Sequence, residues 1–383
     1  MRTLIKNGLV YSNEERSFLP LDILIESKRI STISQRNGLD GIEAEIIDAS
    51  NFRITSGLID VHTHGIAGAD FLFADKDDLS KMSRAYLSHG VTTVMPTLAS
   101  GTLENMINAA KNINEFTTES GADFCGIHLE GRYLNPKKRG AHALELLSIP
   151  NADELDVFGT LNLKNFHISA AFELDEDKSF LNKALSLGAT LSLGHTDANY
   201  KQAKELEKLG VTAYTHLYNA MPPLHHRDGG TVAACLNGNA FAELICDGIH
   251  ISPEIVNLTR KIKRDRLVLI SDSMEATDCP DGEYSIAGNK VTVKSGIAHT
   301  LDGALAGSTL TLDRALENLM SLCDIKLEDA IINATEAPAK EVGIFDEYGS
   351  IDVGKHADML FIDRDKFKID KIIKSGEIIF LKS

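Results

Sequence analysis

The chain of 383 residues is long enough for a large barrel with a smaller appended domain, and its 43% hydrophobic and 25% charged residues are typical of a globular protein. These values exclude a disordered chain. The net charge of -16 argues against a nucleic-acid-binding surface and against attraction to anionic membranes, so an anionic substrate would need a local cluster of positive charge.

Signals for secretion or membrane insertion are not expected in this chain. Residues 1–16 contain no apolar core followed by a cleavage site, so we expect no signal peptide. No apolar run is long enough to predict a transmembrane helix. The five cysteines are scattered and include no C-x-x-C pair, which indicates reduced thiols and a cytoplasmic location.

Short apolar stretches alternate with helical patterns through the middle of the chain. The predicted strands, rich in Val, Ile, Leu and Thr, cover residues 57–62, 91–97, 125–131, 165–171, 189–195, 211–217, 242–248 and 266–272. Helical patterns between them cover residues 76–90, 102–116, 177–188 and 200–210. Eight strand–helix units in about 250 residues predict an α/β fold, the (β/α)8 TIM barrel, with a doubly wound open sheet as the alternative.

Polar residues at the ends of the predicted strands favour the barrel over the open sheet. In a TIM barrel, catalytic residues collect at the C-terminal ends of several different strands. Such ends carry His62, His64, Glu130, His195, His216 and Asp272.

The two ends of the chain differ from its middle. Residues 1–53 and 341–383 alternate between apolar and polar residues as strands do, and we expect them to form one small β-sandwich domain. Residues 54–340 would then form the barrel domain. Residues 308–323 and 327–340 are predicted to be two helices that connect the barrel to the sandwich.

The pair His62 and His64 ends the first predicted strand. Side chains two residues apart on a strand point to the same face, so both imidazoles can face one metal ion. Taken alone, the pair is more simply explained as two polar residues at the end of a strand.

Further strand ends carry residues that suit a metal ion. Glu130 is either a solvated carboxylate or a ligand that bridges metals, while His195 and His216 each follow an apolar strand and together favour a pair of ligands. Imidazole with carboxylate suits zinc or iron. Asp272 is either the N-cap of the next element or a general base beside the metal. His128 lies on the same face as Glu130 and is a candidate to orient it.

Several motifs, taken together and in order, resemble one known family. They are "GLIDVHTHG", "GIHLEGRYLNPKKRGAH", "LSLGHTDANY", "THLYNAMPPLHHRDGG", "ICDGIHISPE" and "LVLISDSMEATDCPDGEY". The chain resembles the N-acetylglucosamine-6-phosphate deacetylases of the amidohydrolase superfamily over nearly its whole length. The resemblance implies a barrel with a small β-sandwich, a homodimer, and hydrolysis of an amino-sugar phosphate to glucosamine-6-phosphate and acetate in amino-sugar catabolism.

The resemblance also implies roles for the strand-end residues. Glu130, His195 and His216 would hold one divalent metal ion, zinc with iron as the alternative. Some members carry Gln-x-Asn at the first strand and use one metal, whereas His62 and His64 make a second site available here, so one or two ions are expected per subunit. Asp272 would be the catalytic aspartate.

Contacts to the sugar phosphate follow from the same resemblance. They would come from His142, His250 and Arg227, and from the backbone at Asn219 and Ala220. Arg227 and His250 would act across the dimer interface. Arginine suits phosphate because its planar guanidinium donates two parallel hydrogen bonds.

The chain departs from the usual family pattern at three places. Arg132 stands where proline follows "HLEG", "MPPL" replaces Met-Ser-Pro-Leu, and "ISDS" replaces Thr-Asp-Ala. Arg132 is expected to add positive charge near Glu130 and to alter the substrate loop. These departures leave open a deacetylase of N-acetylgalactosamine-6-phosphate, another amidohydrolase such as a cyclic amidohydrolase or deaminase, and a non-catalytic sugar-phosphate sensor.

Overall fold

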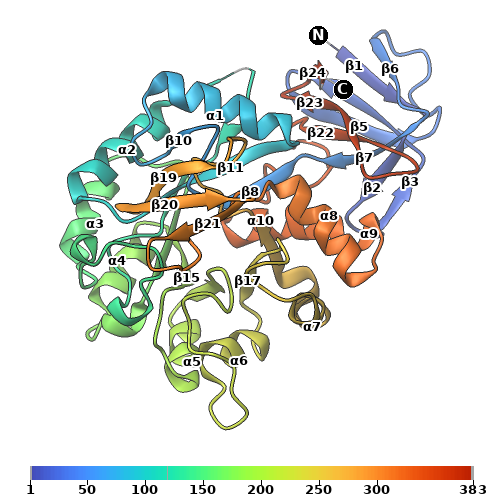
Figure 1. Ribbon diagram of the computed structural model, residues 1–383. Coiled ribbons are helices and arrows are strands. Elements are labelled where there is room, and N and C mark those ends of the chain that lie inside the picture. The colour runs from blue at the N-terminus through green and yellow to red at the C-terminus, as the bar shows by residue number, and fades with distance from the viewer. Residues whose placement is uncertain (1, 119, 381–383) are drawn as a thin grey trace.

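A parallel β-barrel forms the centre of the protein (Figure 1) in the computed structural model, which describes residues 2–118 and 120–380. Within these residues, the barrel strands are β8 (Leu58–Thr63), β11 (Val91–Leu98), β13 (Ile127–Leu129), β14 (Phe166–Ala170), β15 (Thr190–Leu193), β16 (Val211–Tyr214), β17 (Phe241–Ile245) and β18 (Leu267–Ile270). Neighbours in the chain pair in parallel. Each predicted strand is confirmed.

The ring closes between its first and last strands. The backbone N–H of Asp272 donates to the carbonyl of His62 over 2.9 Å, and the N–H of His64 donates to the carbonyl of Ser273 over 2.8 Å. These bonds bring the C-terminal ends of β8 and β18 side by side. The predicted (β/α)8 barrel is therefore confirmed and the open sheet is excluded.

An α-helix follows each barrel strand and packs outside it. The helices are α1 (Lys76–Ser88), α2 (Leu103–Glu115), α3 (Ala152–Gly159), α4 (Ser179–Ser186), α5 (Tyr200–Lys208), α6 (Gly230–Leu236), α7 (Pro253–Lys263) and α8 (Leu312–Cys323). Helix α1 begins with a capping box, in which the Asp75 carboxylate accepts from the N–H groups of Asp77 and Asp78. Because helices cover the barrel, a strand such as β11 is buried along its whole length.

The helices predicted after the last strand are shorter than expected. Helix α8 begins at Leu312 rather than residue 308, because the N–H of Ser308 donates to the carbonyl of Asp272 and holds this segment against the end of β18. The helix predicted at 327–340 is divided into α9 (Leu327–Ala330), a 3-10 turn (Ile331–Ala334) and α10 (Glu336–Glu341).

A three-stranded antiparallel sheet, which is not among the predicted elements, lies between β18 and α8. Its strands are β19 (Gly282–Ile286), β20 (Asn289–Lys294) and β21 (Ile297–Thr300). Ala287 and Gly288 both have positive φ in the first two-residue turn, and Ser295 and Gly296 do in the second, as type I′ hairpins require. Ile286 and Ala287 reach the barrel mouth. Shorter strands are β9 (Gly65–Ile66), β10 (Ala69–Asp70) and β12 (Asp123–Phe124).

Two further sheets, built from both ends of the chain, form the β-sandwich beside the barrel; Figure 1 shows blue and red strands together there. One contains β5 (Arg29–Gln35), β4 (Leu21–Glu26), β1 (Arg2–Lys6) and β6 (Glu45–Asp48). The other contains β24 (Glu377–Phe380), β23 (Ile369–Lys374), β22 (Met359–Asp363), β7 (Phe52–Ser56), β2 (Leu9–Ser12) and β3 (Ser17–Leu19). Ile5 and Ile23 meet Met359 and Phe361 in the shared core. The predicted sandwich is confirmed, and its boundaries at residues 53 and 341 stay a prediction.

A buried lysine joins the sandwich to the barrel. Lys374 is 2% exposed, and its ammonium donates to Asp358 over 2.8 Å and to Asp123 of β12 over 2.5 Å. Burial lowers the pKa of Lys374, but the two carboxylates outweigh it and raise the pKa above its ordinary value. The lysine is therefore charged and paired.

Replacing Lys374 should destabilise the protein strongly. In K374M the carboxylate of Asp358 stays buried without its cation, so we expect a loss of about 3–5 kcal/mol of folding free energy. The measurement is thermal and denaturant unfolding beside the control K208A, which removes the exposed pair of Lys208 with Glu205 and should change little. Equal stability of the two variants would contradict the assignment.

Candidate metal centre

The six strand-end residues predicted from the sequence meet at the C-terminal mouth of the barrel. His62 belongs to β8 and His64 follows it, while Glu130 follows β13 directly. His195, His216 and Asp272 each lie two residues beyond the end of their strand. All six are buried.

Three of these residues adopt a backbone conformation that is rare outside glycine. The φ angles are +46° at His195, +31° at His216 and +48° at Asp272. Each left-handed residue turns the chain at the end of its strand, at a cost of about 1–3 kcal/mol. Strain repeated at the ends of β15, β16 and β18 is typical of a functional site.

Glu130, His195 and His216 form the first cluster of possible metal ligands. Oε1 of Glu130 lies 3.1 Å from Nε2 of His195 and 2.9 Å from Nε2 of His216, and the two Nε2 atoms are 3.0 Å apart. The three ligand atoms therefore converge on one point.

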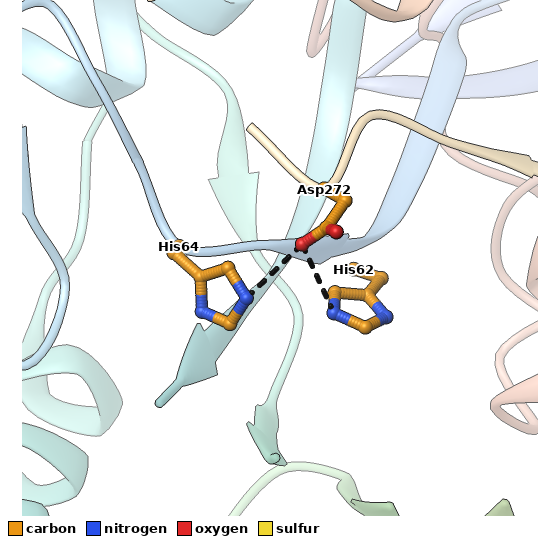
Figure 2. Close-up of side chains that lie close together, drawn as sticks. All are labelled: His62, His64 and Asp272. Atoms are coloured by element: carbon orange, nitrogen blue, oxygen red, sulfur yellow. Dashed lines mark ion pairs between the residues drawn. The ribbon is translucent and has the colours of Figure 1, made fainter. Parts of the chain in front are cut away.

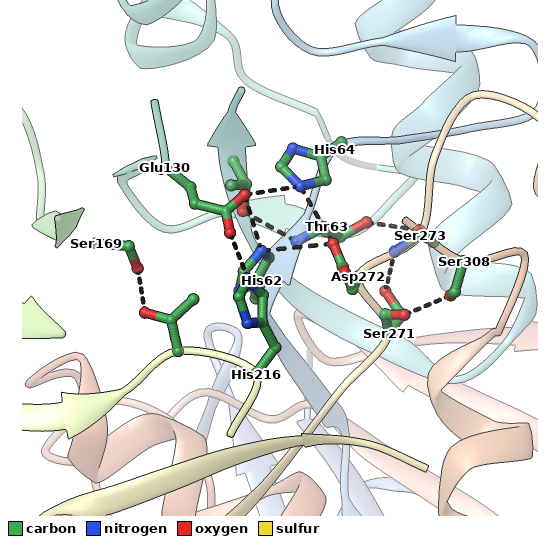
Figure 3. A network of polar contacts seen from close by, with 12 residues as sticks. His62, Thr63, His64, Glu130, Ser169, His216, Ser271, Asp272, Ser273 and Ser308 are labelled. Carbon is green, nitrogen blue, oxygen red and sulfur yellow. Dashed lines mark hydrogen bonds and ion pairs between the residues drawn. The ribbon is translucent and has the colours of Figure 1, made fainter. Parts of the chain in front are cut away.

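His62, His64 and Asp272 form the second cluster (Figure 2). Oδ1 of Asp272 lies 3.2 Å from Nε2 of His64 and 3.5 Å from Nε2 of His62. The same imidazole atoms lie 3.1 Å and 3.3 Å from Oε2 of Glu130. Glu130 thus directs one oxygen to each cluster, and Figure 3 shows its carboxylate beside His64 and His216, one residue of each cluster.

The hydrogen bonds of the imidazoles fit a cation in this centre. Nδ1 of His195 donates to the carbonyl of Lys138 over 2.8 Å, so Nε2 of a neutral ring carries a lone pair toward Glu130. Nε2 of His62 is buried without a hydrogen bond among the described residues. Lone pairs and carboxylate oxygens that face one another repel unless a cation or a proton lies between them. These residues therefore fit a divalent metal ion.

Burial and charge set the protonation of the metal-free centre. Burial raises the pKa of Glu130, but the surrounding histidines outweigh it and hold the pKa well below its usual range. Burial lowers the pKa of His64, but Asp272 and Glu130 raise it to about 9. His64 therefore carries a proton when metal is absent, and metal binding at its ring must displace that proton.

A cavity of about 150 Å³ opens above the two clusters. It is lined by His64, Glu130, Gly140, Ala141, His142, His195, His216, Asn219, Ala220, Ile245, His250, Asp272, Ile286, Ala287, Leu305 and Gly307. Four of the five predicted substrate contacts are therefore brought together with the metal clusters. His62 lies behind them and is fully buried.

His142 and His250 are held in different ways. Nδ1 of His142 lies 2.8 Å from Oγ of Ser100, and burial with the nearby His195 lowers the pKa of His142 to about 3, so its ring is neutral. Nδ1 of His250 donates to Asp247 over 2.7 Å. Arg227 is not among the cavity residues and lies on an exposed loop, 2.7 Å from Nε2 of His226.

The expected effect of Arg132 on the centre is not seen. Its guanidinium binds the carboxylate of Glu154 through Nε and Nη2, each over 3.2 Å, and also donates to the carbonyl of Gly101. Glu154 of α3 therefore neutralises the charge of Arg132, and this ion pair anchors the loop after β13. Arg132 also has φ of +63°, a left-handed conformation that a proline could not adopt.

Two further polar residues support the centre from inside the barrel. His128 is buried between Thr97 and Ser169, with ring nitrogens 3.0 Å and 2.7 Å from their hydroxyl oxygens, and it does not touch Glu130 through these bonds. Glu243 on β17 accepts from Nδ1 of His62 over 2.9 Å and is not among the predicted site residues. The sequence feature that could have indicated Glu243 is a single glutamate inside the apolar run "FAELI".

Comparisons with known proteins agree with this geometry. The amidohydrolase family matches residues 53–379. The chain is 33% identical over 364 residues to the N-acetylglucosamine-6-phosphate deacetylase of Vibrio furnissii, covering 94% of this chain and 91% of that protein. It is also 33% identical to the N-acetylgalactosamine-6-phosphate deacetylase of Escherichia coli O157:H7, covering 80% and 82%.

Solved structures show the same architecture. The N-acetylglucosamine-6-phosphate deacetylase of Pasteurella multocida superposes with a TM-score of 0.92 at 26% identity. The superposition covers 99% of this chain and 100% of that protein. A mutant enzyme from Mycobacterium smegmatis in complex with N-acetyl-D-glucosamine-6-phosphate superposes with a TM-score of 0.87 at 26% identity, covering 99% and 98%.

The fold and the clusters define a metal-dependent barrel hydrolase. The chain belongs to the amidohydrolase family. Among the residues that the structure describes, no helix is long and apolar enough to cross a membrane.

Removing a ligand of the first cluster should reduce metal content. We expect H195N, purified from medium supplemented with zinc, to hold markedly less metal than the unchanged protein, because one of three converging donors is lost. Elemental analysis measures this. H356Q, in which the changed histidine stacks on Tyr348 away from the barrel mouth, is the matched control. Full metal content in H195N would remove His195 from the ligand set.

Proposed function

We propose that this protein is a metal-dependent hydrolase that removes the acetyl group from N-acetylglucosamine-6-phosphate, giving glucosamine-6-phosphate and acetate in amino-sugar catabolism. The observation that carries this proposal is the convergence of Glu130, His195 and His216 beneath a small cavity. The relatives with this name match nearly the whole chain, and one structural neighbour holds that sugar phosphate.

The metal ligands follow from the two clusters. Glu130, His195 and His216 would hold one divalent ion, and His62, His64 and Asp272 face the place of a second. Imidazole and carboxylate suit zinc, with iron as the alternative. When bound, such an ion polarises a carbonyl and lowers the pKa of bound water from its usual value to about 7.

Asp272 is the proposed acid and base. Its Oδ1 lies between the two clusters and at the cavity wall, where it can take a proton from the attacking water. It would then return that proton to the nitrogen of the acetamide as the C–N bond breaks, because an amide anion is too poor a leaving group to depart unassisted. Burial raises the pKa of Asp272, but His64 and His62 outweigh it and lower the pKa below its ordinary value, so the carboxylate begins ionised.

The remaining predicted residues would bind the substrate. Neutral His142 would donate a hydrogen bond to the acetamide carbonyl, while His250 and the backbone at Asn219 and Ala220 line the same cavity. Arg227 would hold the phosphate from a homodimer partner, which accounts for its place on an exposed loop outside the cavity of its own chain. We propose a homodimer on this basis, and a cytoplasmic location because the five cysteines are free thiols.

A substrate panel tests the function directly. Acetate release is measured with zinc-loaded protein on N-acetylglucosamine-6-phosphate, its galactosamine epimer and unphosphorylated N-acetylglucosamine. We expect the highest kcat/KM for N-acetylglucosamine-6-phosphate. A higher value for the epimer would reassign the sugar, and sugar-phosphate binding without acetate release would indicate a sensor.

Replacing Asp272 should separate metal binding from turnover. D272N keeps the shape of the side chain but cannot accept the proton, so we expect kcat to fall by at least the 100-fold typical of a lost general base. Elemental analysis should still find the metal held by Glu130, His195 and His216. Turnover close to that of the unchanged protein, with metal confirmed, would exclude Asp272 from the acid–base role.

A further inference from the structure

Glu243 belongs to neither metal cluster, yet it forms hydrogen bonds to a histidine of each. Its Oε2 accepts from the ring Nδ1–H of His62 over 2.9 Å and from the backbone N–H of His216 over 3.1 Å. Its own carbonyl accepts from the N–H of Leu217 over 2.8 Å. The side chain is fully buried in β17, on the barrel interior below the centre.

We infer that Glu243 is a positioning residue that orients His62 and His216 together and so couples the two metal clusters. The inference rests on the proposed function only in that both clusters serve a metal ion. It is carried by the three hydrogen bonds of Glu243, which depend on neither substrate nor metal.

For His62, Glu243 sets the tautomer. An ionised carboxylate only accepts hydrogen bonds, so the proton of a neutral His62 ring must sit on Nδ1. Nε2 then carries the lone pair, and it faces Oε2 of Glu130 and Oδ1 of Asp272 at 3.3 Å and 3.5 Å. A ligand histidine whose other nitrogen donates to a carboxylate is a stronger ligand with a fixed ring orientation.

For His216, Glu243 holds the backbone. The chain turns sharply at this residue, with φ of +31°, and such a conformation persists only where its surroundings hold it. The side chain of Glu243 binds the N–H of His216, and its carbonyl binds the next N–H, that of Leu217. Two consecutive donors of the turn are thereby satisfied, and Nε2 of His216 is directed to Glu130.

The two oxygens of Glu243 differ, because Oε1 has no hydrogen-bond partner among the described residues while Oε2 accepts two bonds. A buried carboxylate is costly unless it is paired and hydrogen-bonded. Its other oxygen, Oε1, faces His167, whose Nε2 is 4.0 Å away, and the buried carboxyl of Glu341. Burial and the charge of Glu243 raise the pKa of Glu341 well above its usual range, so Glu341 is neutral.

This neutral neighbour supplies the matched control. E341Q changes a buried carboxyl beside Glu243 but removes no bond to His62 or His216. E243M removes both acceptor oxygens at similar volume, and E243Q keeps one weaker acceptor. Zinc is titrated into the metal-free form of each full-length variant, and its affinity is compared with that of the unchanged protein.

We expect zinc affinity to fall about 10- to 100-fold in E243M, as is typical when the partner of a ligand histidine is lost, to fall less in E243Q, and to stay unchanged in E341Q. The metal-free proteins are also labelled with ¹⁵N-histidine, and H62N identifies the resonances of His62. The unchanged protein and E341Q should show a proton on Nδ1 of His62 that is held by Glu243, and this Nδ1 signal should shift in E243M and E243Q.

Wild-type zinc affinity in folded E243M, or equal losses in E243M and E341Q, would overturn the inference. If E243M does not fold, E243Q decides, and an unchanged His62 signal in E243Q would overturn it. Neither readout uses a sugar substrate. A protein that binds zinc through Glu243-oriented histidines but releases no acetate would therefore contradict the proposed function and leave this inference standing.

Discussion

Imidazole nitrogens converge on the carboxylate of Glu130, and the rest of the site depends on this constraint. Its two oxygens face two groups of imidazoles, and His195 and His216 bring their Nε2 atoms to 3.0 Å from each other. Such an arrangement is repulsive when neither a proton nor a metal ion lies between these atoms, and it becomes favourable around a cation. The bond from His195 to a carbonyl and that from His62 to Glu243 fix which nitrogen of each ring faces the centre.

The barrel fold brings these ligand atoms together and stabilises the strained turns that direct them inward. Its closure between β8 and β18 places Asp272 beside His62 and His64, from the opposite end of the barrel sequence. The hydrogen bond from the backbone N–H of Ser271 to the carboxylate of Asp60 spans 211 positions in the same way. Left-handed turns at His195 and His216 then direct two more ligands inward. A large packed core around the strands carries the strain of these turns.

Features that follow from local periodicity could be predicted from the sequence. Alternation along a strand placed His62 and His64 on one face, and the ends of apolar strands indicated His195, His216 and Asp272. Features that depend on a distant partner could not. Arg132 binds Glu154, 22 positions away, and Glu243 meets His62, 181 positions away, so neither partner could be predicted locally, although the lone glutamate in "FAELI" distinguishes Glu243 itself. The sheet β19–β21 does carry one, because its strands alternate and its turns contain Ala-Gly and Ser-Gly.

Anomalous diffraction on crystals grown with zinc tests the central claim most directly. Data collected on both sides of the zinc absorption edge locate the ion without reference to activity. The account predicts an anomalous peak about 2.0–2.2 Å from Glu130, His195 and His216, with any second peak beside His62 and His64. A fully loaded protein whose zinc lies elsewhere, with these three side chains free of metal, would contradict it.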